Sequence, residues 1–176
     1  MSARIVVLTG ERGVGKSTVC RKMIDLVKEK NYTCGGVLTV TRHNGERDVL
    51  DVGSGDVRRL TLAPDVGAGV LQGRFHFDPA TLTWGNEVLT RAHGYNLLVV
   101  DELGPLEITR GKGWKNAFDV LYEGDFTLAL VVVRPELLVQ AQLRLPNSAT
   151  TVFTVTQHNR DGLPDVLLKI LERETS

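Results

Sequence analysis

The sequence contains few cysteines and no long apolar segment, and these shortages exclude several classes of protein. Only two of the 176 residues, Cys20 and Cys34, are cysteines. They form neither a C-x-x-C motif nor a pattern with histidine, so a disulfide framework or a structural metal site is not expected. The longest uninterrupted apolar run spans residues 128–133, whereas a membrane-spanning helix needs about 20 such residues. We therefore expect a cytoplasmic protein with no signal peptide and no membrane anchor.

The chain also lacks a net charge. It has 21 Lys plus Arg and 21 Asp plus Glu, which leaves no overall electrostatic attraction to nucleic acid or to an anionic membrane. A nucleic-acid partner is therefore not expected. Aromatic residues make up only 6% of the chain, but 42% of it is apolar, and a chain of this length buries about 70% of its unfolded surface. We expect one domain over residues 1–176 that folds without covalent staples.

Short β-branched runs alternate along the chain with segments of helical period. We expect strands at residues 4–9, 97–100, 128–133 and 151–155, and helices at residues 16–30, 79–94, 114–122, 135–143 and from 163 onward. After the first helix the pattern changes to three short strand-like runs, at residues 37–41, 47–52 and 57–62. Asn44-Gly45 between the first two runs is a hairpin signal. This order predicts an α/β three-layer fold with a mainly parallel sheet and a β-hairpin insertion after the first helix.

A glycine-rich loop follows the first expected strand and precedes the first expected helix. Residues 10–17 satisfy the phosphate-binding motif GxxxxGK[ST] in the structural context that the motif needs. In such a loop, backbone amides and the helix N-terminus surround a phosphate, Lys16 reaches the β- and γ-phosphates, and Ser17 ligates Mg²⁺. Thr18 is expected beside the α-phosphate. The sequence therefore predicts a nucleotide-binding P-loop made of Gly10, Glu11, Arg12, Gly13, Val14, Gly15, Lys16, Ser17 and Thr18.

An acidic pair, Asp101-Glu102, ends the strand expected at residues 97–100. The carboxyl edge of an open α/β sheet is where ligands bind, so this pair should face the phosphates. Asp101 is expected to hold Mg²⁺, directly or through water, and Glu102 to orient or deprotonate an attacking water. A glutamate directly after the Mg²⁺-binding aspartate is typical of the RecA-like and AAA-like branch of P-loop proteins, in which a further strand separates the two motif strands.

Residues 101–108, Asp-Glu-Leu-Gly-Pro-Leu-Glu-Ile, resemble the signature of a small nucleoside-triphosphatase family known as the cancer-related NTPases. Arg42, Gly45 and Arg47 resemble the R-x-x-G-x-R motif of the same family, and residues 155–164 continue the match, which covers essentially the whole chain. The resemblance implies a RecA-like core and slow, Mg²⁺-dependent hydrolysis of ATP, GTP, CTP and UTP to the diphosphate.

Glu107 belongs to the same signature and follows a turn at Gly104-Pro105. The resemblance places it near the active site, as a candidate catalytic residue beside Lys16 and Glu102. Its position equally suits a cap on the next helix, and both interpretations stay open.

Arginines are the candidates for a finger that stabilises charge on the γ-phosphate: Arg42, Arg47, Arg110 and Arg134. A solvated surface position is the alternative for each of them. The sequence departs from the family pattern at Val40, at Val49 and in the glycine-rich segment 110–114. The strand at residues 128–133 also carries no polar residue where the family often has a Thr or a His. We therefore expect slow turnover.

These features predict a Mg²⁺-dependent nucleoside triphosphatase that accepts ATP, GTP and other nucleoside triphosphates. Base selectivity should be poor, because no [NT]KxD guanine-reading motif follows. Asn159 and Arg160 could contact the base or cap a helix. One alternative is a nucleotide or small-metabolite kinase, which would need an Arg-rich lid, whereas residues 135–147 contain only Arg144. Another is a nucleotide-dependent switch or adaptor that binds an unidentified protein partner through residues 110–114.

Overall fold

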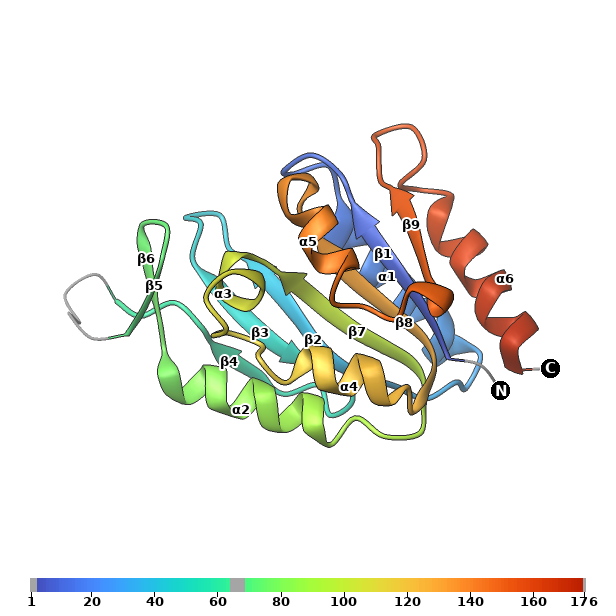
Figure 1. Ribbon diagram of the computed structural model, residues 1–176, viewed down its shortest axis with the longest axis horizontal. Coiled ribbons are helices and arrows are strands. Elements are labelled where there is room, and N and C mark those ends of the chain that lie inside the picture. The colour runs from blue at the N-terminus through green and yellow to red at the C-terminus, as the bar shows by residue number, and fades with distance from the viewer. Residues whose placement is uncertain (1–2, 64–68, 176) are drawn as a thin grey trace.

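The computed structural model describes residues 3–63 and 69–175 and shows a sheet with helices on both faces (Figure 1). The seven strands lie in the order β4-β3-β2-β7-β8-β1-β9. Their bounds are β1 (Arg4–Thr9), β2 (Cys34–Thr41), β3 (Arg47–Asp51), β4 (Val57–Arg59), β7 (Tyr95–Leu103), β8 (Phe126–Val133) and β9 (Thr150–Thr154). β2, β7, β8, β1 and β9 pair in parallel. Because β8 lies between β1 and β7, the two motif strands are separated as in RecA-like proteins, which confirms the prediction.

Helices cover each face of the sheet. Within the described residues, no helix has the length and hydropathy needed to span a bilayer. The helices on one face are α1 (Lys16–Glu29) and α6 (Leu163–Thr175), and those on the other are α2 (Pro79–Thr90), α4 (Ala117–Glu123) and α5 (Leu138–Gln142).

The apolar run of β8 shows why both faces must be covered. Successive side chains of a strand point to opposite faces. Leu130 and Val132 therefore pack with α1 and α6, whereas Val131 and Val133 pack with α2, α4 and α5. A strand that is apolar on both faces suits only the middle of a three-layer structure. The three layers predicted from the sequence are present.

The insertion after α1 extends the sheet with antiparallel strands. β2 pairs with β7 on one side and with β3 on the other, and β3 pairs with β4. The turn between β2 and β3 contains Asn44-Gly45, and Gly45 has a φ of 85°, a left-handed conformation that glycine adopts at low cost. The predicted hairpin is confirmed.

Some elements differ from the sequence-based expectation. The strand expected at residues 57–62 ends at Arg59, and a second hairpin, β5 (Val70–Gln72) and β6 (Phe75–Phe77), was not expected. Strands of three residues are too short to show a periodicity. The short helix α3 (Pro105–Ile108) follows β7.

The helix expected at residues 114–122 begins only at Ala117. Trp114 precedes it, and its ring packs against Gly85 of α2. The apolar spacing of this segment reflects burial against α2 rather than a continuous helix. The helix expected at residues 135–143 consists of a 3-10 turn, η1 (Pro135–Leu137), followed by α5, and a second 3-10 turn, η2 (Asn147–Ala149), precedes β9.

Candidate active site

The glycine-rich loop between β1 and α1 has the backbone that its sequence suggests. Gly10, Gly13 and Gly15 have φ values of 144°, 76° and 111°, a region that residues with a Cβ rarely adopt. A Cβ at Gly10 would also lie 2.5 Å from the backbone oxygen of Val155. α1 begins at Lys16, so the amides of its first turn, which have no partner within the helix, adjoin the loop.

The Lys16 ammonium folds back over this loop. Its Nζ donates hydrogen bonds to the backbone oxygens of Gly10 at 2.5 Å and Glu11 at 2.9 Å. Partial burial lowers the pKa of Lys16, while the negative charges of Glu102 and Asp101 act in the opposite direction. The ammonium therefore lies within electrostatic reach of both the loop and the acidic pair.

Asp101 lies within the last part of β7 and is only 2% exposed. The Ser17 hydroxyl, from the first turn of α1, hydrogen bonds to its carboxylate. Thr39 Oγ1 on β2 donates a hydrogen bond to the backbone oxygen of Asp101 at 2.6 Å. Burial raises the pKa of Asp101 to about 7, although the Ser17 hydrogen bond acts in the opposite direction. Among the described residues, Asp101 Oδ2 has no hydrogen-bond partner, so one buried acidic oxygen can still accept a ligand.

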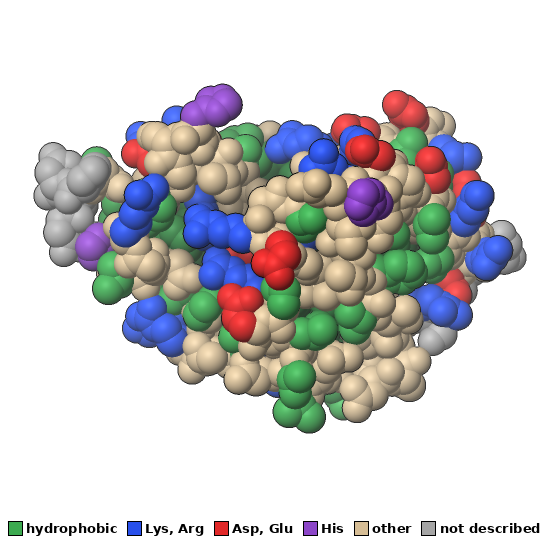
Figure 2. Space-filling view, turned by 90° about the horizontal axis from the view of Figure 1, so that it is seen from above, with side chains coloured by type: hydrophobic (Ala, Val, Ile, Leu, Met, Phe, Trp, Pro, Cys, Tyr) green, Lys and Arg blue, Asp and Glu red, His purple; other side chains and the backbone are tan. Residues whose placement is uncertain are grey.

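Glu102 is held by an arginine from the neighbouring strand. Arg134 directly follows β8, and its Nη2 and Nε lie 2.8 and 3.5 Å from Oε1 and Oε2 of Glu102. The two side chains are 32% and 22% exposed, so the pair lies at the edge of the sheet rather than in the core. Figure 2 looks onto this edge and shows basic and acidic side chains side by side near its middle. The fork of an arginine around a carboxylate fixes the orientation of both groups.

A small cavity opens beside Glu102. Its volume is about 20 Å³, and its walls include Thr39, Arg47, Gln72 and Glu107. A polar cavity of about 10–15 Å³ is enough for one water molecule. The cavity therefore has room for a water molecule next to Glu102.

Glu107 is 6% exposed and holds the loop after β7 together. Its Oε2 accepts a hydrogen bond from the Gly104 amide at 2.8 Å, and its Oε1 accepts one from the Trp114 amide at 2.9 Å. Burial raises the pKa of Glu107 to about 7, against the effect of these amide hydrogen bonds. Glu107 therefore reaches the wall of the Glu102 cavity and at the same time caps α3.

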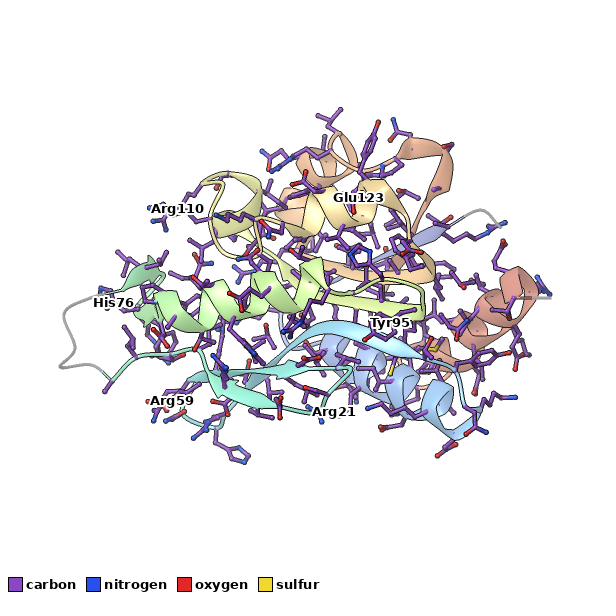
Figure 3. All side chains as sticks on the ribbon, turned by 90° about the horizontal axis from the view of Figure 1, so that it is seen from below. Arg21, Arg59, His76, Tyr95, Arg110 and Glu123 are labelled. Atoms are coloured by element: carbon purple, nitrogen blue, oxygen red, sulfur yellow. The ribbon has the colours of Figure 1, made fainter. Side chains whose placement is uncertain are left out.

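Two of the candidate arginines are bonded to groups outside the acidic pair. Arg42 is exposed and pairs with Asp48 on β3 at 2.7 Å. Arg110 extends from the turn after α3 toward the β5–β6 hairpin, where its Nη1 donates to the Leu71 backbone oxygen (Figure 3).

The other two candidate arginines lie beside Glu102. Arg134 binds its carboxylate, and Arg47 lines the same cavity. The Arg47 guanidinium lies 5.6 Å from the centre of the Phe77 ring. Burial lowers the pKa of Arg47, and Glu102 acts in the opposite direction.

The loop after β9 is fastened to the phosphate loop and to α1. Arg160 Nη1 donates to the Val14 backbone oxygen at 3.3 Å, and Lys22 of α1 pairs with Asp161 at 2.8 Å. The Asn159 side chain accepts a hydrogen bond from the Thr156 amide and donates one to the backbone oxygen of Thr154, the last residue of β9. Asn159 thus closes the turn, while Arg160 adjoins the phosphate loop.

Thr39 and Gln72 belong to the site but carry no sequence motif. Gln72 lies on β5, a strand too short to be expected. Thr39 lies on β2, and the pairing of β2 with β7 brings it beside Asp101. The polar position near the carboxyl end of the run at residues 37–41 was the one available signal.

Known proteins are similar to this chain in sequence and in fold. A family model described as NTPase matches residues 5–168. The nucleoside-triphosphatase THEP1 of Methanopyrus kandleri is 34% identical over 174 residues, which cover 93% of each chain. That of Hyperthermus butylicus is 31% identical over 175 residues, which cover 96% of this chain and 91% of the relative. The chain belongs to the NTPase family. It is therefore a nucleoside triphosphatase, a hydrolase whose substrates are nucleoside triphosphates, and the resemblance noted in the sequence is confirmed.

Solved structures share the fold of this NTPase. THEP1 from Aquifex aeolicus superposes with a TM-score of 0.74 at 19% identity, covering 96% of this chain and 99% of that chain. A human cancer-related nucleoside triphosphatase superposes with a TM-score of 0.71 at 24% identity, covering 97% of this chain and 98% of that chain. P-loop NTPases of this kind typically use a divalent metal.

Proposed function

We propose that this NTPase hydrolyses ATP, GTP and other nucleoside triphosphates to the diphosphate and phosphate in a Mg²⁺-dependent reaction between the P-loop and the acidic pair. The observation that carries the proposal is the convergence of Lys16, Asp101 and Glu102 at one edge of the sheet, within electrostatic reach of one another. In this scheme the backbone of residues 10–18 surrounds the phosphates, and Lys16 neutralises charge on the β- and γ-phosphates.

Ser17 and Asp101 have the chemistry of a Mg²⁺ site. Mg²⁺ prefers oxygen ligands and keeps several of its waters. The Ser17 hydroxyl is bonded to the Asp101 carboxylate, and Asp101 Oδ2 is a buried oxygen without a hydrogen-bond partner among the described residues. Ser17 would ligate the ion directly, and Asp101 directly or through water. Bound Mg²⁺ would neutralise charge on the β- and γ-phosphates.

Glu102 is the proposed general base. Its carboxylate lies on the wall of the cavity that has room for one water. The water oxygen attacks the γ-phosphorus, Glu102 takes one water proton, and the bond from the γ-phosphorus to the bridging oxygen breaks. The electron pair of that bond leaves with the nucleoside diphosphate, and the proton passes to the released phosphate. Glu107 supports the wall of the cavity through its amide hydrogen bonds.

Water is the proposed acceptor, because the cavity beside Glu102 has room for one water molecule. Slow turnover is part of the proposal, since β8 ends in the apolar residue Val133. Low base selectivity follows because the contacts in this scheme are with phosphates. The free thiols of Cys20 and Cys34 suit a reducing compartment such as the cytoplasm.

Phosphate release from ATP by wild type, Glu102→Gln and Glu123→Gln tests this proposal. Glu102→Gln should keep nucleotide affinity and lose about 10² to 10⁴ in rate, the usual contribution of a positioned acid or base. Glu123 is exposed on α4 and is the matched control (Figure 3). Chelation of Mg²⁺ should stop turnover by the wild-type protein.

Equal rates for wild type and Glu102→Gln would remove Glu102 from the mechanism. Negligible release by wild type that rises when an acceptor is added, with a phosphorylated acceptor as product, would favour a kinase.

A further inference from the structure

Arg134 has a position that the hydrolysis scheme does not use. β8 lies between the strand that enters the P-loop and the strand that carries the acidic pair. The parallel register pairs Leu8 with Val132, so two residues further on Arg134 is level with Gly10, the first residue of the loop. The chain therefore delivers an arginine to the edge of the sheet between the phosphate loop and Glu102.

The next residue, Pro135, fixes how the backbone leaves the sheet. A residue that precedes proline is restricted to extended conformations, and Arg134 has a φ of −72° and a ψ of 149°. Arg134 thus continues the line of β8, and the chain turns away into η1 immediately afterwards. Because a buried strand and a proline fix the backbone at this position, any movement of Arg134 is a movement of its side chain.

The charges around Arg134 show what its side chain can reach. The Lys16 ammonium, which binds the β- and γ-phosphates in the proposed reaction, lies within electrostatic reach of both Arg134 and Glu102. A guanidinium has five N–H donors. Its two hydrogen bonds to Glu102 use the Nη2 and Nε positions, which leaves the remaining N–H groups for a phosphate.

We propose that Arg134 is the arginine finger of this NTPase and that it acts from within the same chain. This inference rests on the proposed function. In the structure the guanidinium holds Glu102 in place. With a triphosphate bound it contacts the γ-phosphate, stabilises the charge that develops there, and keeps Glu102 directed at the cavity. Because a diphosphate lacks the γ-phosphate, Arg134 contributes to binding of the triphosphate and not of the diphosphate.

Arg47 is the competing residue, because it lines the same cavity as Glu102. Its guanidinium lies over the ring of Phe77, whereas that of Arg134 is hydrogen bonded to the proposed base. The geometry therefore favours Arg134, and Arg47 serves as the comparison in the experiment.

The experiment compares wild type with Arg134→Gln, Arg134→Lys, Arg47→Gln and the exposed control Arg91→Gln at the end of α2. Turnover of ATP gives kcat and KM, and calorimetry with Mg²⁺ gives the Kd of ADP and of a β,γ-imido analogue of ATP. Arg134→Gln should lower kcat by about 10²-fold or more, since a finger contributes about 10³ to 10⁵. It should raise the Kd of the analogue about tenfold more than it raises the Kd of ADP. Arg134→Lys should recover part of kcat, and Arg91→Gln should match wild type.

Wild-type kcat in Arg134→Gln would overturn the proposal, and so would an equal loss of affinity for ADP and the analogue. If Arg47→Gln were the only variant that weakened binding of the analogue more than binding of ADP, the finger would be Arg47. The pair Glu102→Gln and Glu102→Gln/Arg134→Gln separates this inference from the function on which it rests. A wild-type rate in Glu102→Gln refutes the base, while weaker analogue binding in the double variant still supports contact between Arg134 and the γ-phosphate.

Discussion

In the proposed reaction the Lys16 side chain exchanges backbone acceptors for phosphate oxygens. In the structure its ammonium donates hydrogen bonds to the backbone oxygens of Gly10 and Glu11. A triphosphate offers charged oxygens instead, which form stronger hydrogen bonds with an ammonium than neutral carbonyls do. The free energy of triphosphate binding therefore contains the difference between these two sets of bonds.

Lys16→Ala should weaken binding of the imido analogue of ATP by about tenfold or more, which calorimetry measures directly. Lys28→Ala is the control, because Lys28 is exposed on the same helix. A folded Lys16→Ala protein with wild-type affinity would contradict the assignment of the phosphate site.

Glu107 makes the stability of the fold depend on pH. Burial raises its pKa from an ordinary value of 4.5 to about 7. Between these two values the unfolded chain has released the proton while the folded chain still holds it. The free energy of unfolding therefore falls as the pH rises through this window and becomes constant again above it.

Urea unfolding of wild type and Glu107→Gln across this window measures the effect. As the pH rises through this window, the free energy of unfolding of wild type should fall by up to about 3 kcal/mol more than that of the variant. The variant should also be less stable by about 1–2 kcal/mol, because a glutamine oxygen can accept from only one of the two amides at Gly104 and Trp114. Parallel pH profiles for the two proteins would show that Glu107 does not titrate in this window.

Elements are predictable from the sequence where their pattern is local. The apolar run of β8, the Asn44-Gly45 turn and the glycine-rich loop each occupy neighbouring residues, and each element forms where it was expected. What depends on distant contacts could not be predicted. The spacing at Trp114 resembles a helix because the ring is buried against α2, and the bond between Arg134 and Glu102 exists only once β8 lies beside β7.

The N-cap of α2 gives a test at the scale of one element. Asp78 accepts hydrogen bonds from the amides of Ala80 and Thr81, and Pro79 occupies the first position of the helix. Asp78→Ala should lower the free energy of unfolding by about 1–2 kcal/mol in a urea titration, whereas Asp78→Asn should stay within about 0.5 kcal/mol of wild type. An unchanged unfolding midpoint in Asp78→Ala would mean that packing alone determines where α2 begins.

At the scale of the whole molecule, the strand order gathers the phosphate loop, Asp101, Glu102 and Arg134 at one edge of the sheet. In the proposed reaction these residues contact the phosphate groups of the nucleotide, so we expect the base to contribute little to selection. The catalytic efficiencies for ATP and GTP should therefore differ by less than about a hundredfold, and each should inhibit turnover of the other. A larger ratio in a competition assay would reveal a dedicated base pocket.

Arg4 at the start of β1 forms an ion pair with Glu174 near the end of α6, at the end of the sheet away from the phosphate loop (Figure 1). An affinity tag or surface linker joined at either of these positions would leave from the same side of the molecule. Immobilised in this way on a sensor chip, the enzyme would present its nucleotide-binding edge to the flowing solution, so ligand exchange could be followed without steric interference from the support.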